Sequence, residues 1–300
     1  MVFISYTTPD KNKHIIPIAY ATDNNYTYPT LVSITSLLEN IKHHPKTFYD
    51  IYIMLSNDFT EKNKEILKSA QELYPNKCTI TFINMGDMFK EQKTFPITKY
   101  YRLALHDKLP HIDKIIYLDG DTIIFEDLTD LINLDMKGYY ILGFLDNLFW
   151  ALEMYKIKDA IVLNTGVLLM DLKALRDFNT TEKFREFMMK YNNSVVQEDQ
   201  TIINVVLQKY INKLPPKYGI WGFDSIQLAL EHNKVQRPKF KYNTETYKMA
   251  FELPAIVHFT GSKPFNNKNA TYYLDWWNYA KKTKYYDKIY EYSLSKNYSY

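Results

Sequence analysis

The sequence predicts an α/β protein whose mostly parallel sheet carries helices on both faces. The first observation is that short apolar, β-branched runs alternate with segments of helical periodicity over the first two-thirds of the chain, which is the order of strand–helix–strand crossovers. The second is that polar and acidic residues directly follow several of these runs. This pattern fits such a sheet, in which ligands bind at the carboxyl ends of the strands. A chain of 300 residues is long enough to bury a core for one large domain.

Strands and helices alternate regularly through the first part of the chain. Apolar runs predict strands over residues 15–21, 51–55, 78–83 and 114–118. Between them, apolar residues recur at helical spacing over 31–41 and 66–73, and a further helix is predicted over 99–107. Asp58 or Thr60 is expected to cap the helix over 66–73, because either side chain accepts a hydrogen bond from a free backbone N–H group.

The second part of the chain is predicted to continue with further elements of the same kind. We expect strands over 140–144 and 160–170, helices over 172–190 and 200–210, and a last strand over 255–259. Pro215, Pro216 and Pro238 punctuate residues 212–250, which are therefore predicted to be irregular. Without a long linker, the chain is expected to form one domain over 1–265, followed by an aromatic, lysine-bearing tail over 266–300.

Composition excludes several classes of protein. The chain has only eight glycines and contains neither G-x-G-x-x-G nor G-x-x-x-x-G-K-[ST], which excludes a Rossmann dinucleotide site and a P-loop. If the protein holds a phosphate, something other than a glycine-rich loop must bind it. The formal net charge of +3 lacks the surplus typical of nucleic-acid binding, and the single Cys78 excludes an intrachain disulfide and a cysteine zinc site.

The sequence predicts neither a membrane span nor a secretory signal. No stretch approaches the roughly 18 apolar residues of a span, and the apolar start at 1–6 is too short for a signal peptide, so we expect a cytosolic protein. The aromatic, basic residues 272–300 would suit peripheral contact with the anionic inner face of a membrane. The alternative, which we favour, is that they form helices that pack Trp276, Trp277 and Tyr279 onto the domain.

The sharpest local signal is a pair of aspartates directly after a predicted strand. Asp119 and Asp121 follow the apolar run 115–118, and Gly120 between them allows a turn that would bring both carboxylates onto one cation. Two carboxylates suit a hard divalent ion such as Mg²⁺ or Mn²⁺. An acidic surface turn is the structural alternative, and phosphatases of the haloacid dehalogenase type also place an Asp-x-Asp pair after an apolar strand. Those phosphatases have Thr or Val where Ile123 stands here, and no convincing second acidic metal segment follows downstream.

Polar residues also follow or interrupt other predicted strands. They are Asp23 and Asn25 after the first strand, Asn164-Thr165-Gly166 within an apolar run, Asp199-Gln200 at a helix start, and His258, Gly261 and Lys263 after the last strand. Each group also has a purely structural explanation. Asn-Thr-Gly is explained by a β-bulge, Asp199 by a helix cap, and His258 by a half-buried histidine with satisfied hydrogen bonds.

In this order and spacing, the motifs resemble those of the retaining glycosyltransferases of family 8, which include glycogenin and bacterial lipopolysaccharide galactosyl- and glucosyltransferases. The resemblance extends from about residue 15 to residue 265. It implies the GT-A fold, a Rossmann-like nucleotide-binding sheet without the dinucleotide glycine fingerprint. It also implies transfer of a hexose, glucose or galactose, from a UDP-sugar to a glycan, lipopolysaccharide or protein acceptor.

The resemblance implies a role for each matching residue. It assigns the Mn²⁺ or Mg²⁺ ligands to Asp119, Asp121 and His258, with Gly120 in the same donor-binding turn. Uracil and ribose would contact Ala21, Asp23 and Asn25. The donor sugar would contact Arg102, Asp146, Asn164 and Gly166, and the diphosphate would contact Gly261 and Lys263. Asp199 and Gln200 would face the anomeric carbon.

The last motif departs from the family pattern His-x-x-Gly-x-x-Lys-Pro-Trp, because Lys263 comes one residue early and Phe265 replaces Trp. Retention in this family is attributed to same-face attack or to a covalent intermediate. Gln200 is a poor nucleophile, so we expect same-face attack, with Asp199 orienting the sugar or the acceptor. A protein that binds UDP-sugar without turning it over is a further alternative.

Overall fold

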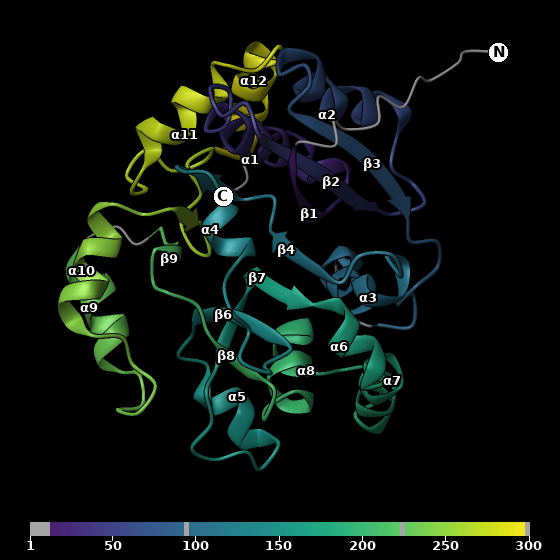
Figure 1. Ribbon diagram of the computed structural model, residues 1–300, viewed down its shortest axis with the longest axis vertical. Helices are drawn as coiled ribbons and strands as arrows, with labels where there is room; N and C mark the ends of the chain where they lie inside the picture. The colour runs from purple at the N-terminus through teal and green to yellow at the C-terminus, as the bar shows by residue number, and fades with distance from the viewer. Residues whose placement is uncertain (1–12, 93–95, 223–225, 298–300) are drawn as a thin grey trace.

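The computed structural model describes residues 13–92, 96–222 and 226–297, and its centre is a seven-stranded sheet of order β3-β2-β1-β4-β7-β6-β8 (Figure 1). The strands are β1 (His14–Thr22), β2 (Thr47–Leu55), β3 (Cys78–Asn84), β4 (Lys114–Leu118), β6 (Ile141–Leu145), β7 (Leu163–Asp171) and β8 (Ile211–Lys213). All neighbouring strands pair in parallel except β7, which runs antiparallel to both β4 and β6. The predicted α/β class with a mostly parallel sheet is therefore confirmed.

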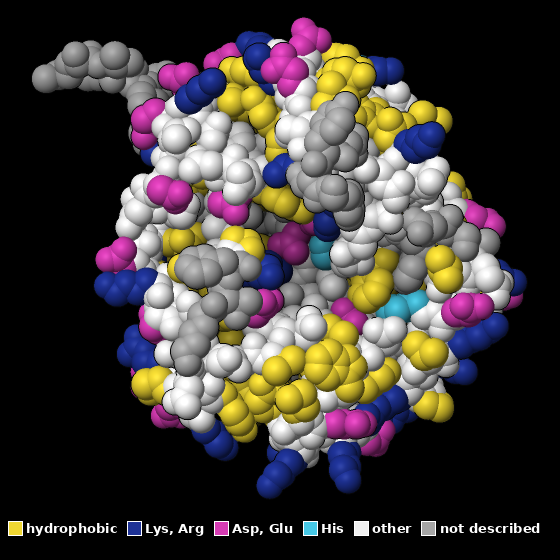
Figure 2. All heavy atoms as spheres, turned by 180° about the vertical axis from the view of Figure 1, so that it is seen from behind, with side chains coloured by type: hydrophobic (Ala, Val, Ile, Leu, Met, Phe, Trp, Pro, Cys, Tyr) yellow, Lys and Arg dark blue, Asp and Glu magenta, His cyan; other side chains and the backbone are white. Residues whose placement is uncertain are grey.

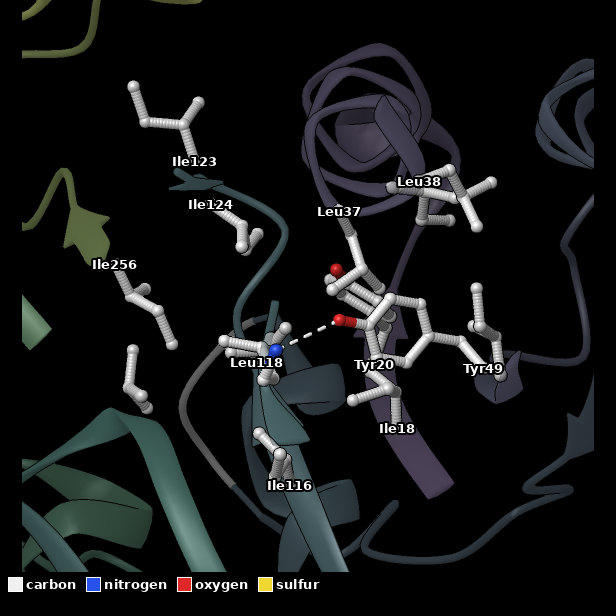
Figure 3. Close-up of a cluster of buried hydrophobic side chains, with 14 of the residues drawn as sticks. Ile18, Tyr20, Leu37, Leu38, Tyr49, Ile116, Leu118, Ile123, Ile124 and Ile256 are labelled. Atoms are coloured by element: carbon white, nitrogen blue, oxygen red, sulfur yellow. Dashed lines mark hydrogen bonds between the residues drawn. The ribbon is translucent and has the colours of Figure 1, made fainter. Parts of the chain in front are cut away.

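Alternate residues of the central strands face two separate hydrophobic cores. Ile16, Ile18 and Tyr20 of β1 pack with residues of α1 (Thr27–Glu39) and α2 (Glu61–Leu73), as Figure 3 shows in part. Ala19 faces the other core, which contains residues of α6 (Leu172–Asp177), α7 (Thr180–Lys190) and α8 (Glu198–Val206). Because both faces of the sheet are covered at its centre, the central strands are mostly apolar, which is why they were recognisable as apolar runs.

The predicted helices are present but differ in their bounds and type. Thr60, and not Asp58, caps α2, since its hydroxyl accepts from the N–H of Asn63. The helix predicted over 172–190 is divided into α6 and α7, because Asn179 between them has a left-handed φ of 55°. The helix predicted over 99–107 is mostly 3₁₀, as η2 (Ile97–Ala104), and continues into the short α3 (Leu105–Lys108). Smaller elements are η1 (Asn24–Tyr26), α4 (Thr129–Ile132) and α5 (Phe149–Met154).

The prediction that residues 212–250 are irregular was wrong. They contain β9 (Tyr218–Trp221), α9 (Ile226–Lys234) and α10 (Thr244–Glu252), besides the end of β8. Pro215 and Pro216 fall in the connection between β8 and β9, and Pro238 falls between α9 and α10. The prolines therefore mark the boundaries of elements, where a missing N–H group breaks no ladder or helix bond.

A second sheet, which the sequence did not reveal, lies beside the first. It has the order β5-β10-β9, with β5 (Thr122–Ile124) antiparallel to β10 (Ile256–His258) and β9 parallel to β10. The last predicted strand therefore exists, as β10, but it belongs to this small sheet and not to the central one. Its register pairs His258 with Thr122, which places His258 next to the Asp-x-Asp segment.

Helix α1 joins the two sheets. Almost all of its residues are buried, including Ser33, Ser36 and several other small polar residues. The hydroxyl of Ser36 accepts from the N–H of Ile124 at 2.9 Å, and the amide of Asn40 donates to the carbonyl of Ile124 at 2.7 Å. These side chains satisfy backbone groups on β5 that its edge position would otherwise leave unpaired.

The C-terminal segment packs onto the domain, as the favoured alternative predicted. It forms α11 (Tyr273–Ala280) and α12 (Tyr286–Asn297), which lie near α1 in Figure 1. Trp276 is fully buried in the same core as β1, and its ring centroid lies 5.8 Å from that of Phe265. The indole N–H of Trp277 donates to the carbonyl of Pro264 at 3.1 Å. The boundary drawn at residue 265 stays a prediction.

Among the described residues, no helix has the length and apolar character needed to cross a membrane.

Replacing Trp276 by Ala is expected to lower the free energy of unfolding by about 3–5 kcal/mol, because it opens a cavity beneath α11 in the core that also contains residues of α1 and β1. Leu274→Ala on the same helix is the matched control, since Leu274 is 72% exposed, and it should change stability by less than about 0.5 kcal/mol. Urea denaturation of both variants measures the difference. Equal stabilities of the two variants would show that α11 does not contribute to the core.

Candidate active site

The predicted site residues gather where the two sheets meet. The ends of β1, β4 and β10 and the start of β7 surround a cavity of about 520 Å³, here called the first cavity. Its lining includes Ala21, Asp23, Arg102, Asp119, Gly120, Asp121, Asn164, His258 and Lys263. Figure 2 shows a hollow in one face of the molecule in which acidic, basic and histidine side chains gather.

The Asp-x-Asp segment lies at the point where the chain leaves one sheet for the other. The N–H of Asp119 donates to the carbonyl of Gly166 at 2.8 Å, which extends the pairing of β4 with β7. The carbonyl of Asp121 accepts from the N–H of Phe259 at 3.0 Å, which extends the pairing of β5 with β10. Gly120 passes so close to α1 that a Cβ atom there would lie 2.3 Å from the Thr30 hydroxyl. Glycine is therefore required by the close approach of α1.

His258 faces both carboxylates from the neighbouring strand. Its Nε2 lies 3.5 Å from Asp119 Oδ2 and 3.2 Å from Asp121 Oδ1. Its Nδ1 lies 3.0 Å from Asn164 Oδ1, an oxygen that also accepts from the N–H of Gly166 at 2.9 Å. This acceptor keeps the hydrogen on Nδ1, so the lone pair of Nε2 points toward the carboxylates.

Gly166 makes room for this imidazole. A Cβ atom at residue 166 would lie 2.0 Å from Cε1 of His258, so no other residue fits there without displacing the ring. The ligand atoms of Asp119, Asp121 and His258 all lie within 4.8 Å of one another. Two carboxylates and one oriented imidazole nitrogen fit a divalent cation such as Mn²⁺.

Asp121 is buried and has two basic neighbours. The ammonium group of Lys263 contacts its Oδ2 and the carbonyl of Phe259, and the hydroxyl of Tyr26 donates to the same Oδ2 at 3.2 Å. Burial alone would raise the pKa of Asp121, but the ammonium group of Lys263 holds it well below its usual range. Lys263 therefore reaches the candidate metal site although it comes one residue early in its motif.

Arg102 links Asp119 to Asp199, which was predicted to face the anomeric carbon. Its guanidinium is buried, with Nη2 2.8 Å from Asp119 Oδ1 and Nε 3.1 Å from Asp199 Oδ2. It also donates to the carbonyl of Thr165 and lies 4.4 Å from the centre of the Tyr117 ring. With these contacts made, Arg102 holds the two carboxylates in fixed positions.

Asp199 is held in a low-dielectric position between its partners. Its Oδ2 accepts from the Thr165 hydroxyl at 3.0 Å besides contacting Arg102. Burial raises the pKa of Asp199 to about 6, although Arg102 acts in the opposite direction. This carboxyl can therefore exchange a proton near neutral pH. A carboxylate that only caps a helix would not need such a raised pKa.

Asp146, Asn164 and Gln200 form a hydrogen-bonded group beside the first cavity. Gln200 Nε2 donates to Asp146 Oδ2 at 3.0 Å, and Asn164 Nδ2 donates to the same oxygen at 3.3 Å. Burial raises the pKa of Asp146. The three residues line a second cavity of about 550 Å³, which also contains Trp221, Leu228 and Ser262 and shares Asn164 and Thr260 with the first.

Two predicted residues lie elsewhere than expected. Asn25 is exposed and lines neither cavity, although its N–H and that of Tyr26 donate to Asp23 Oδ1 at 2.8 and 2.9 Å. Gly261 lines the second cavity, whereas Lys263, the other residue predicted to contact the diphosphate, lines the first. No atom lies within 4 Å of a Cβ at Gly261, so no close neighbour requires glycine there.

The sequence reasoning missed Tyr117, whose hydroxyl donates to Asp119 Oδ1 at 2.8 Å. Tyr117 precedes Asp119 by two residues, and this spacing on a strand places both side chains on one face. The signal was therefore present in the sequence. Tyr26 and Thr165 were also missed, and only the folded chain brings them to Asp121 and Asp199.

Comparison with known proteins gives a consistent result. Residues 17–269 match the family model described as glycosyl transferase family 8. The chain is 26% identical to general stress protein A of Bacillus subtilis over 92% of this chain and 95% of that protein. It is 27% identical to lipopolysaccharide 1,2-glucosyltransferase of Escherichia coli K12 over 83% of this chain and 72% of that protein.

The fold is also that of solved glycosyltransferases. The galactosyltransferase LgtC, solved in complex with donor and acceptor sugar analogues, superposes with a TM-score of 0.70 at 21% identity. The match covers 93% of this chain and 96% of LgtC. The predicted GT-A fold is therefore confirmed, whereas the roles of the individual site residues stay predictions.

The raised pKa of Asp199 predicts a pH-dependent contribution to stability. A carboxyl whose pKa rises on folding from 3.8 to about 6 binds its proton more tightly in the folded state. The resulting stabilisation is complete below the unfolded pKa and is lost as the pH rises through about 6. Wild type should therefore lose stability relative to Asp199→Asn, which does not titrate, between about pH 5 and pH 7.5.

Urea denaturation at both pH values measures this difference, with Asp135→Asn as the control. Asp135 is exposed, so its replacement removes no buried carboxyl. The stability difference between wild type and Asp135→Asn should therefore stay constant over this pH range. A constant difference for Asp199→Asn as well would contradict the raised pKa.

Proposed function

Because this chain belongs to glycosyl transferase family 8, we propose that it is a retaining enzyme that transfers a hexose from a UDP-sugar with the help of a divalent metal ion. Glucose and galactose are the proposed sugars, and the acceptor is a carbohydrate, lipid-linked or protein hydroxyl. The observation that carries the proposal is the cluster of Asp119, Asp121 and His258 at the edge of a cavity that is also lined by Lys99, Arg102 and Lys263.

Asp119, Asp121 and His258 would hold the metal ion, Mn²⁺ or Mg²⁺. When bound, the ion would act as a Lewis acid toward the diphosphate oxygens and stabilise the departing nucleoside diphosphate. Lys263, beside Asp121 at the cavity wall, would add positive charge for the same phosphates. Arg102 would act mainly by fixing Asp119 and Asp199, since its guanidinium is buried between them.

The nucleoside would bind at the end of β1. Ala21 and Asp23 line the first cavity there and are proposed to contact uracil and ribose. Asp23 Oδ1 already accepts two backbone N–H groups, so its other oxygen is the one proposed to accept from a ribose hydroxyl. Asn25 is exposed outside the cavity, and the proposal does not depend on it.

The sugar would lie between the two cavities, near Asp146, Asn164, Gly166, Asp199 and Gln200. The transition state of such a transfer is oxocarbenium-like, and Asp199 and Asp146 are the carboxyl groups proposed to stabilise it. The amide of Gln200 is bound to Asp146 and Asn164, which supports an orienting role and not a nucleophilic one. We therefore propose same-face attack by the acceptor, which would enter through the second cavity.

The two alternative functions now have unequal support. The family match favours a glycosyltransferase over a haloacid dehalogenase-type phosphatase, because the match spans residues 17–269. The phosphatase would release phosphate from a generic phosphomonoester without sugar nucleotide. A protein that only binds UDP-sugar would bind the donor without forming product or hydrolysing it.

Replacing Asp121 by Asn is expected to lower kcat/KM with a UDP-hexose and Mn²⁺ by at least about a hundredfold, because one metal ligand loses its charge. Calorimetric titration should also show that UDP binding no longer depends on the metal. Asp135→Asn is the matched control, since Asp135 is exposed and remote from both cavities, and it should keep full activity. Unchanged metal-dependent activity in Asp121→Asn would contradict the metal assignment.

We further propose that the protein acts in the cytosol and contacts anionic membranes through residues 272–300. The exposed side chains of Leu274, Tyr290 and Leu294 support this. Lys284 and Lys288 of the same segment are ion-paired with Glu72 and Glu291, so they would have to exchange these partners for lipid phosphates. Wild type should float with phosphatidylglycerol vesicles at low salt, because apolar insertion and charge attraction act together. A Leu274→Asp, Tyr290→Asp variant should stay in solution. Equal flotation of both proteins would show that this surface is not the contact.

A further inference from the structure

The second cavity has an aromatic wall that no motif in the sequence predicted. Trp221, the last residue of β9, lines this cavity together with Gly222 and with Leu228 of α9, which is 46% exposed. The chain between β8 and α10 was expected to be irregular, so none of these residues was assigned a role. Their position beside Asp146 and Gln200 gives the second cavity an apolar side and a polar side.

Trp221 is held from behind by other rings. Its ring centroid lies 4.4 Å from that of His232 on α9 and 6.5 Å from that of Phe144 on β6. His232 itself stacks on Phe144, with an angle of 10° between the ring planes and 6.2 Å between centroids. Gly219 has a φ of 152°, and a Cβ there would lie 2.9 Å from Phe144. β9 can therefore pass directly over Phe144.

The imidazole of His232 packs against both Phe144 and Trp221. Its Nδ1 lies 3.5 Å from the Tyr247 hydroxyl, and its Nε2 lies 3.5 Å from the Gln236 amide. Burial lowers the pKa of His232 to about 4, so the ring is neutral near pH 7. A neutral, flat ring with polar edges can stack on Phe144 and pack at an angle of 42° against Trp221, while its nitrogens meet polar atoms.

The polar side of the cavity carries groups that bind hydroxyls. Asp146, Asn147, Gln197 and Ser262 line it, and they offer carboxylate, amide and hydroxyl groups that can donate and accept hydrogen bonds. A pyranose ring has the matching surface, with C–H groups on one face and hydroxyls around its edge. An acyl chain would leave these polar groups unpaired, which carries a large penalty.

We propose that the second cavity binds a pyranose ring of the acceptor, with its C–H face stacked on Trp221, and that His232 is the positioning residue that holds the indole. The inference rests on the proposed function, since it concerns the acceptor of the same transfer reaction. It restricts the proposed acceptor substrates from hydroxyl compounds in general to those that present a terminal sugar ring. Asn164 and Thr260 line both cavities, so a sugar bound here would be next to the donor site.

The test uses saturation-transfer NMR on the full-length protein with UDP and Mg²⁺. The probes are lactose, methyl β-D-glucopyranoside and methyl β-D-galactopyranoside, each at millimolar concentration. In wild type, at least one probe should show saturation concentrated on the protons of one ring face. Trp221→Phe should retain this pattern, and Trp221→Ala should weaken binding about tenfold or more, as expected for the loss of a stacking platform.

Trp150→Ala is the matched control, because Trp150 is 49% exposed and lines neither cavity. It should bind the probes as wild type does. Calorimetric titration of UDP into the same samples tests the proposed function separately from the acceptor inference. If wild type does not bind UDP, the proposed function fails, and the acceptor inference fails with it. If UDP binds but no probe is saturated, or if Trp221→Ala binds the probes as wild type does, only the acceptor inference is overturned.

The role of His232 is tested through the KM of the acceptor. His232→Ala should raise the KM for the saturated probe several-fold, with the KM for the UDP-sugar within about twofold, and His232→Phe should restore the acceptor KM. The near-ultraviolet circular dichroism of Trp221 should change in His232→Ala and recover in His232→Phe. If both variants show wild-type KM values for the acceptor, His232 does not position the indole.

Discussion

The close approach of two like-charged carboxylates, the partly buried Asp119 and the buried Asp121, at the junction of two sheets is the constraint on which the cleft depends. Only Gly120 separates them, yet the backbone of Asp119 pairs with β7 and that of Asp121 pairs with the chain after β10. At Gly120 the chain passes against α1, where a side chain would collide with Thr30. Because the two sheets diverge here, both carboxylates point to the same candidate metal site, and His258 lies opposite them. Without the second sheet, the same tripeptide would be an acidic turn.

Charges of this kind repel each other and lose hydration, so they require compensation. Arg102 compensates Asp119 from within the protein, where Thr165 and the ring of Tyr117 fix its guanidinium. Lys263 compensates Asp121 from the loop after β10, with a side chain that is partly exposed. The two halves of the site thus differ in exposure. The Arg102 side chain beside Asp119 and Asp199 is 5% exposed, and the Lys263 side chain beside Asp121 is 20% exposed.

Aromatic residues, 16% of the chain, support the loops that complete the site. Behind α1, Trp276 packs on Phe265 and Trp277 binds the carbonyl of Pro264, which anchors the segment that carries Lys263. Beneath the second cavity, Phe144 and His232 support Trp221. Large rings therefore fix these loops without the ladder bonds of a strand.

The sequence by itself determined the α/β class, the central strands and the family, because a sheet buried on both faces requires continuous apolar runs and because the motifs keep a fixed order along the chain. It also pointed to Asp119, Asp121 and His258, whose residue types suit a cation. It did not show that β9 and β10 leave the central sheet, that Pro215 and Pro238 separate regular elements, or that Asn25 lies outside the cavity. Only the tertiary structure decided which side chains face one another, because the pairing of strands distant in sequence depends on the packing of the whole chain and not on local pattern.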